Sequence, residues 1–116
     1  MRVPVTIVEV PPFPKLAEAI MPEDDLDAFK TFIASNPEAG VVIQGTGGLR
    51  KVRWRLKGRG KSGGARVIYY FQSDEIPIFL LTVYAKSRKT DLTAGERAAL
   101  RALSKRIIKT YQGGSK

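Results

Sequence analysis

The fold is decided by residues 49–71, which read Leu49-Arg-Lys-Val-Arg-Trp-Arg-Leu-Lys57, Gly58-Arg-Gly-Lys-Ser-Gly-Gly64 and Ala65-Arg-Val-Ile-Tyr-Tyr-Phe71. In the first part apolar and basic residues alternate, which places Val52, Trp54 and Leu56 on one face of a strand and the cations on the other. The glycine-rich middle part predicts a hairpin loop. A third strand over residues 76–84 follows after a short link, so the pattern predicts an antiparallel meander.

Outward from this hairpin, the chain predicts one strand and three helices. Residues 6–10 are β-branched and stop at Pro11-Pro12, which indicates a first strand. Two helices follow, a short one after Phe13 and one from Pro22 that ends at Asn36-Pro37. The last helix begins at a capping box formed by Thr93 and Glu96 and ends at Gly113-Gly114. We therefore predict an α+β fold, β-α-α-β-β-β-α, in one domain spanning residues 1–116.

The run from Gly40 to Gly48 is also rich in glycine. It lacks the Gly-Lys-Ser/Thr ending of a phosphate-binding loop and leads into a strand rather than a helix. We predict a tight turn there.

Positive charge is concentrated in the second half of the chain. The net charge is +9, but residues 1–48 hold three basic and seven acidic residues, whereas residues 49–116 hold 17 basic and four acidic ones. Between Arg50 and Arg66 there are eight Lys or Arg and no Asp or Glu. Like charges this close repel one another, so this segment favours an anionic partner such as a nucleic acid.

The composition removes several kinds of chemistry. The chain has no Cys and no His, which excludes thiolate nucleophiles, histidine acid–base pairs and metal sites built on sulfur or imidazole. We expect no cofactor and no metal. The start of the chain does not resemble a signal peptide, and the longest nearly apolar run, residues 76–85, is too short to span a bilayer. We expect a cytoplasmic protein that does not enter membranes.

Several motifs together resemble the RelE/ParE toxin superfamily, and the HigB-like branch most. They are Gly45-Thr-Gly-Gly-Leu-Arg-Lys-Val-Arg-Trp54, Gly58-Arg-Gly-Lys-Ser-Gly-Gly-Ala-Arg-Val-Ile-Tyr-Tyr-Phe71, Leu81-Thr-Val-Tyr-Ala-Lys86 and Asp91-Leu-Thr93. The resemblance implies a microbial RNase fold, in which an antiparallel sheet carries two N-terminal helices and a basic concave surface. It also implies the toxin of a type II toxin–antitoxin module. Such toxins cleave mRNA in the ribosomal A site without a metal, through attack of the 2′-OH on the neighbouring phosphate.

The resemblance implies that particular basic residues are catalytic. Lys51 and Arg53 match a Lys-x-Lys strand motif, and Arg66 matches the arginine that opens the next strand. The family has a basic pair after the last strand, and either Lys86 or Arg88 is its counterpart here. The tyrosine that follows in RelE has no counterpart at residues 90–93, so the proton-transfer role stays open. If a tyrosine contributes, Tyr70 and Tyr84 are the candidates, and both are also candidates for binding RNA.

Further basic residues are candidates for binding RNA. They are Arg55 and Lys57 on the strand, Arg59 and Lys61 in the hairpin loop, and Arg97, Arg101 and Lys105 on a ridge of the last helix. Each has a plainer interpretation. The strand, loop and helix cations could be solvated, Arg66 could pair with Asp74 or Glu75, and we expect Trp54 to be core rather than a base-stacking platform.

The leading hypothesis is a ribosome-dependent endoribonuclease whose partners are mRNA, ribosomal RNA and an antitoxin. By resemblance, the antitoxin carries a helix-turn-helix DNA-binding domain. The alternative is a ParE-like DNA gyrase poison without nuclease activity. A third hypothesis is an RNA-binding module that does not cleave.

Overall fold

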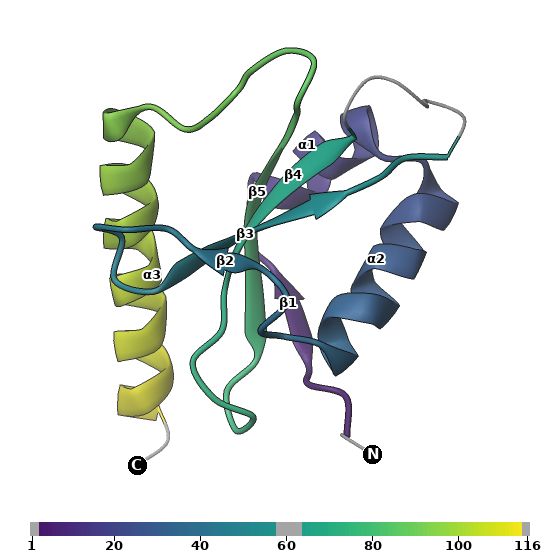
Figure 1. Ribbon diagram of the computed structural model, residues 1–116. Helices are drawn as coiled ribbons and strands as arrows, with labels where there is room; N and C mark the ends of the chain where they lie inside the picture. The colour runs from purple at the N-terminus through teal and green to yellow at the C-terminus, as the bar shows by residue number, and fades with distance from the viewer. Residues whose placement is uncertain (1–2, 58–63, 115–116) are drawn as a thin grey trace.

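The computed structural model describes residues 3–57 and 64–114, and the side chains among them up to Tyr111. The loop cations Arg59 and Lys61 lie outside the described residues. Within these ranges the chain forms a sheet with helices on both sides (Figure 1). The elements are β1 (Ile7–Glu9), α1 (Phe13–Ile20), α2 (Glu23–Ser35), β2 (Val41–Val42), β3 (Leu49–Trp54), β4 (Ala65–Tyr70), β5 (Ile78–Ala85) and α3 (Ala94–Gly114).

The order of strands in the sheet is β1-β5-β4-β3-β2. The α+β class and the antiparallel meander of β3, β4 and β5 are confirmed. The sheet is not purely antiparallel, however, because β1 runs parallel to β5. The sequence shows the strand at residues 7–9 but not the strand beside which it lies, 71 residues later. The structure also adds an edge strand, β2, that the sequence did not predict. The strand β3 ends at Trp54, so Arg55 and Lys57 lie beyond it.

The face of the sheet toward α1 and α2 is a continuous apolar core. Val52, Val67 and Leu80 from the strands lie in it with Phe29 and Ile33 of α2. Trp54 packs edge-on against Phe29, with ring centroids 5.4 Å apart, so its predicted core position is confirmed.

The opposite face is covered by α3, on the other side of the sheet from α2 (Figure 1). Leu49, Ile68 and Phe79 are buried there, with Leu100 and Leu103 of α3 packed against them. No helix within the described ranges is both long and apolar enough to cross a membrane.

Tyr69 ties β4 to the segment that enters the sheet at β2. Its hydroxyl donates to Pro37 O at 2.7 Å and accepts from Gly40 N at 2.8 Å. A Cβ added at Gly40 would lie 2.8 Å from the Tyr69 ring, so glycine is needed there. The following glycine run forms the predicted turn, with positive φ at Gly45, Gly47 and Gly48.

Candidate nucleic-acid interface

Three side chains stand in a row across the α3 side of the sheet. In the strand register, Arg53 of β3 pairs with Arg66 of β4, and Arg66 pairs with Tyr84 of β5. Side chains directly opposite one another on a sheet have Cβ atoms about 5 Å apart. Two arginines in that relation repel each other, so the row has the charge and spacing to hold an anion between its members.

A β-bulge brings Tyr84 into this row. Ile68 pairs with Thr82 and Tyr69 with Leu80, so Leu81 is an extra residue in β5. An extra residue reverses the facing of every residue after it. Tyr84 is thus directed to the same face as Arg66, whereas an unbroken β5 would direct it to the α1 side.

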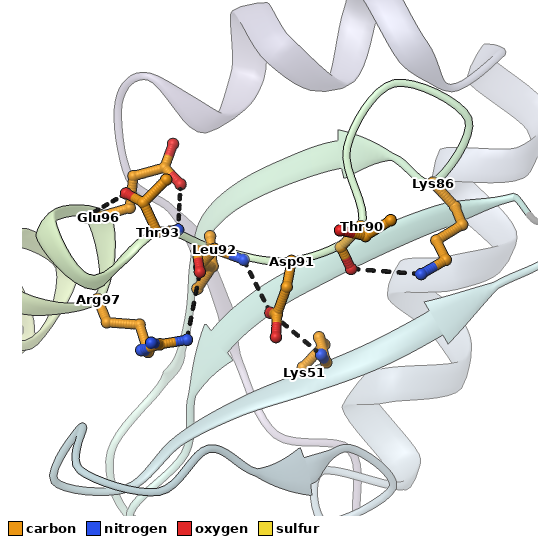
Figure 2. Close-up of polar contacts among 8 residues, drawn as sticks. All are labelled: Lys51, Lys86, Thr90, Asp91, Leu92, Thr93, Glu96 and Arg97. Atoms are coloured by element: carbon orange, nitrogen blue, oxygen red, sulfur yellow. Dashed lines mark hydrogen bonds and ion pairs between the residues drawn. The ribbon is translucent and has the colours of Figure 1, made fainter.

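Lys51 adds a third cation, two residues along β3 from Arg53 and on the same face. Its Nζ lies 3.4 Å from Asp91 Oδ1, which also accepts from Leu92 N at 2.7 Å (Figure 2). The hydrogen bond from Leu92 and the nearby Lys51 hold the pKa of Asp91 below its usual value. Asp91 is therefore an ionised carboxylate at the edge of the cationic face.

The segment that carries Asp91 is fixed at both ends (Figure 2). At its start, Lys86 Nζ donates to Thr90 O at 3.3 Å. At its end the predicted capping box is present: Thr93 N donates to Glu96 Oε1 at 2.8 Å, and Glu96 N donates to Thr93 Oγ1 at 3.1 Å. These bonds satisfy donors that the first turn of α3 would otherwise leave unpaired.

The hydroxyl of Tyr84 has no hydrogen-bond partner among the described residues, although the residue is buried, with 8% of its surface exposed. Burial, and next the negative charge of Asp91, raise its pKa above the usual value for tyrosine. The ammonium of Lys89 lies 5.8 Å from the centre of its ring. An unpaired buried hydroxyl is costly, and it calls for an explanation such as a bound water or a role in function.

The other predicted site residues are spread more widely. Lys86 extends the β4–β5 ladder, its N–H donating to Gly64 O at 3.0 Å, so it follows Tyr84 on the same face. Arg88 is exposed and lines an apolar groove next to the row, which Tyr84 also lines. Tyr70 is four residues from Arg66, about 13 Å along an extended strand, and lies beside Lys105 of α3.

Asp74 and Glu75 follow this far end of β4, which does not favour either as a partner for Arg66.

The predicted ridge on α3 faces the glycine turn. Arg97, Arg101 and Lys105 line a shallow hollow with Gln44 and Gly45. Arg97 also donates to Leu92 O at 3.2 Å, so it helps to fix the segment that carries Asp91. Arg101 and Lys105 are exposed.

Sequence reasoning missed Asp91 as a member of this site. Its only signal was its place in the quoted Asp91-Leu-Thr93 motif, just before the capping box. Nothing in the local pattern connects it with Lys51, 40 residues earlier. Within the described part of the chain, no three carboxylates gather into a group that could hold a metal ion.

Comparison with known proteins supports this arrangement at the level of the fold. Residues 35–113 match the family described as the RelE toxin of the RelE/RelB toxin–antitoxin system. The solved structure of a free Escherichia coli toxin RelE, an arginine-to-alanine double mutant, is similar with a TM-score of 0.54. The two chains are 14% identical, over 75% of this chain and 88% of that one. At this identity the likeness establishes the shared fold alone.

Proposed function

This chain belongs to the RelE toxin family of RelE/RelB toxin–antitoxin systems, and on that premise we propose that it is a ribosome-dependent endoribonuclease that cleaves translated mRNA. We propose further that residues 1–116 form one toxin domain that acts in the cytoplasm. The observation that carries it is the row of Arg53, Arg66 and Tyr84 with Lys51 beside it. This row joins clustered positive charge with hydrogen-bonding groups on one side of the sheet.

The arginines fit the part of the reaction that needs charge stabilisation. When the 2′-oxygen attacks the neighbouring phosphate, negative charge builds on the non-bridging oxygens. Guanidinium groups remain protonated and offer two parallel donors to such oxygens. Arg53 and Arg66 therefore clamp the phosphate and stabilise the transition state, and Lys51 adds a third positive charge.

The proton transfers are assigned from the groups that lie beside the row. Asp91 is the carboxylate next to Lys51, and its lowered pKa keeps it ionised at neutral pH. Because the lowered pKa also makes it a weak base, it accepts the proton of the 2′-OH only as the bond to phosphorus forms and that hydroxyl becomes acidic. Tyr84 has a raised pKa and keeps its proton, so it acts as a hydrogen-bond donor to the phosphate. The leaving 5′-oxygen takes a proton from a lysine ammonium, and we assign this role to Lys86 rather than Arg88, because Lys86 follows Tyr84 on the same face.

The ridge residues Arg97, Arg101 and Lys105, together with Arg55 and Lys57, then contribute attraction to ribosomal RNA. Family membership implies an antitoxin partner. We propose further that the chain is HigB-like and that its antitoxin has a helix-turn-helix domain. An excess of cations on the toxin favours an acidic antitoxin segment and binding that weakens with salt.

The test is to map the 5′ ends of cellular mRNA after induction of the toxin without its antitoxin. We expect cuts in phase with codons inside translated reading frames. The double variant Lys51→Ala with Arg66→Ala should abolish both the cuts and the growth arrest. Its charge-matched control, Lys15→Ala with Arg106→Ala, changes exposed residues elsewhere and should cleave like the parent.

Two outcomes would contradict the proposal. A DNA-damage response with intact mRNA would indicate a gyrase poison of the ParE kind. Full toxicity of the folded Lys51→Ala, Arg66→Ala variant would show that these cations are not the site.

A further inference from the structure

An apolar groove lies at the edge of the sheet, next to the cationic face, with which it shares Tyr84. It has a volume of about 860 Å³. One wall is α1, through Leu16 and Ile20, and the other is the first half of α3, through Leu100 and Leu103. Its floor is the last part of β5, residues 81–85.

This floor is an unpaired strand edge. Among the described residues, the strand beside β5 on this side is β1, which pairs with Ile78, Phe79 and Leu80 and lies along only part of β5 (Figure 1). One more bond follows, from Val10 N to Leu80 O at 2.9 Å. Then Pro11 and Pro12, which have no N–H groups, lead the chain away into α1. Beyond Leu80, β5 is therefore paired with β4 alone.

The ladder with β4 shows which backbone groups point into the groove. Lys86 N donates to Gly64 O, so Gly64 and Lys86 are a hydrogen-bonded pair. Such pairs alternate in an antiparallel ladder, so Tyr84 bonds toward β4 while Val83 and Ala85 point away from it. Ala85 O accepts from Arg88 N at 3.0 Å. No described residue bonds to the N–H groups of Val83 and Ala85 or to the C=O of Val83.

We propose that this groove binds an extended segment of the antitoxin, which adds a strand to the sheet beside residues 81–85 of β5. The inference rests on family membership for the existence of the antitoxin, and on the open edge for its place. Adding a strand satisfies the outward backbone groups, and pockets on each side select the side chains.

The walls define the chemistry of the segment. Successive side chains of a strand point to opposite faces. One set would contact Leu16 and Ile20 of α1, and the other would contact Leu100 and Leu103 of α3. Both faces are apolar, so the segment is a continuous apolar run of about five residues rather than an alternating one. Arg88 at the rim favours an acidic residue next to that run, whereas Lys89 there already pairs with Glu96.

The test compares two alanines that are adjacent and exposed on α3. Ala99 lines the groove, whereas Ala98 lines the hollow beside Arg97 and Arg101, so Ala98→Arg is a control for antitoxin affinity and not for cleavage. Arginine is a good helix former, so both Ala99→Arg and Ala98→Arg should fold. For the antitoxin that co-purifies with the tagged toxin, we expect affinity to fall at least tenfold for Ala99→Arg and to stay within twofold for Ala98→Arg.

A second readout follows the backbone directly. In hydrogen–deuterium exchange, the amides of Val83 and Ala85 should be unprotected in the free toxin and protected in the complex. Tyr84, whose amide bonds to β4, should be protected in both. The substitution Ala85→Pro removes one outward N–H. Its control is Val42→Pro at the opposite edge of the sheet. There Ile43 N donates to Leu49 O, so the N–H of the neighbouring Val42 points outward. Only Ala85→Pro should weaken the complex.

Unchanged affinity of Ala99→Arg, or a complex that leaves the amides of Val83 and Ala85 unprotected, would overturn the proposal. If Ala99→Arg instead lost mRNA cleavage while retaining the antitoxin, the groove would be a nucleic-acid site, which also overturns it. Cleavage by each variant is measured without antitoxin, so a failure of the nuclease function is separate from a failure of the groove.

Discussion

Tyr69 and Tyr84 are buried tyrosines on neighbouring strands, but they face opposite sides of the sheet. The Tyr69 hydroxyl has two hydrogen bonds, to Pro37 and Gly40, and the Tyr84 hydroxyl has none among the described residues. The side of Tyr69 is a closed apolar core under α1 and α2. The side of Tyr84 sets two arginines opposite each other. The first face is a closed scaffold, whereas the second combines clustered cations with a hydroxyl that has no hydrogen-bond partner among the described residues.

The largest effect should come from the cationic face. We expect Arg66→Ala to lower the rate of mRNA cleavage on programmed ribosomes by about 10²–10³-fold, the usual loss when one stabilising donor is removed. Arg66→Lys should recover part of this rate because it restores the charge without the paired donors. Arg106→Ala, at an exposed position on α3, is the control and should act at the parent rate. A folded Arg66→Ala toxin with undiminished activity would contradict the assignment.

The two tyrosines should differ in their contribution to stability. Tyr69→Phe leaves the buried Gly40 N–H and Pro37 carbonyl unpaired, and we expect it to lower the free energy of unfolding by about 1–3 kcal/mol. Tyr84→Phe removes a hydroxyl that has no partner, so the change should stay within about 0.5 kcal/mol. Urea denaturation of both variants measures the difference. Equal destabilisation by the two substitutions would mean that Tyr84 is as much a structural residue as Tyr69.

Sequence reasoning predicted the elements better than their long-range partners. Alternation of side chains placed Val52 and Leu56 in the core and the cations opposite, and the capping box of Thr93 and Glu96 is present. Local patterns could not show that β1 pairs with β5, because that contact joins residues 71 apart. Nor could they show the bulge at Leu81, which decides the face of Tyr84.

The same limit applies to the site. Lys51, Arg53 and Arg66 stood out because they lie in one strongly basic stretch. Asp91 did not stand out, because it belongs to the site only through its contact with Lys51, which is distant in the sequence. The choice between Tyr70 and Tyr84 likewise depended on register: only Tyr84 is directly opposite Arg66.

A smaller effect is expected at the capping box. Thr93→Ala removes the hydroxyl that accepts from Glu96 N and should lower the free energy of unfolding by about 1 kcal/mol. Thr110→Ala, at an exposed position within the same helix, should cost less because it removes no cap. Thermal melting of the pair checks this. A larger loss from Thr110→Ala would show that the cap does not hold the start of α3.

The smallest effect concerns acid stability. The pKa of Asp91 is lowered in the folded state, so its stabilising contribution is present above the unfolded pKa and disappears as pH falls through the folded pKa. Between about pH 5 and pH 2, the parent should therefore lose more stability than Asp91→Asn does. Denaturation midpoints across this range measure it. Parallel curves for the two proteins would show that the contacts of Asp91 with Leu92 and Lys51 do not stabilise its ionised form in the folded state.

The central claim is that the α3 side of the sheet, and not the α1–α2 side, is where RNA binds. It is tested most directly by NMR titration of labelled toxin with millimolar RNA trinucleotide that lacks the attacking 2′-OH and cannot be cleaved. We predict shifts of the Nε–H signals of Arg53 and Arg66 and of the Tyr84 ring, with Lys15 and Lys30 unmoved. Shifts confined to α1 and α2, with Arg53 and Arg66 unchanged, would contradict the account.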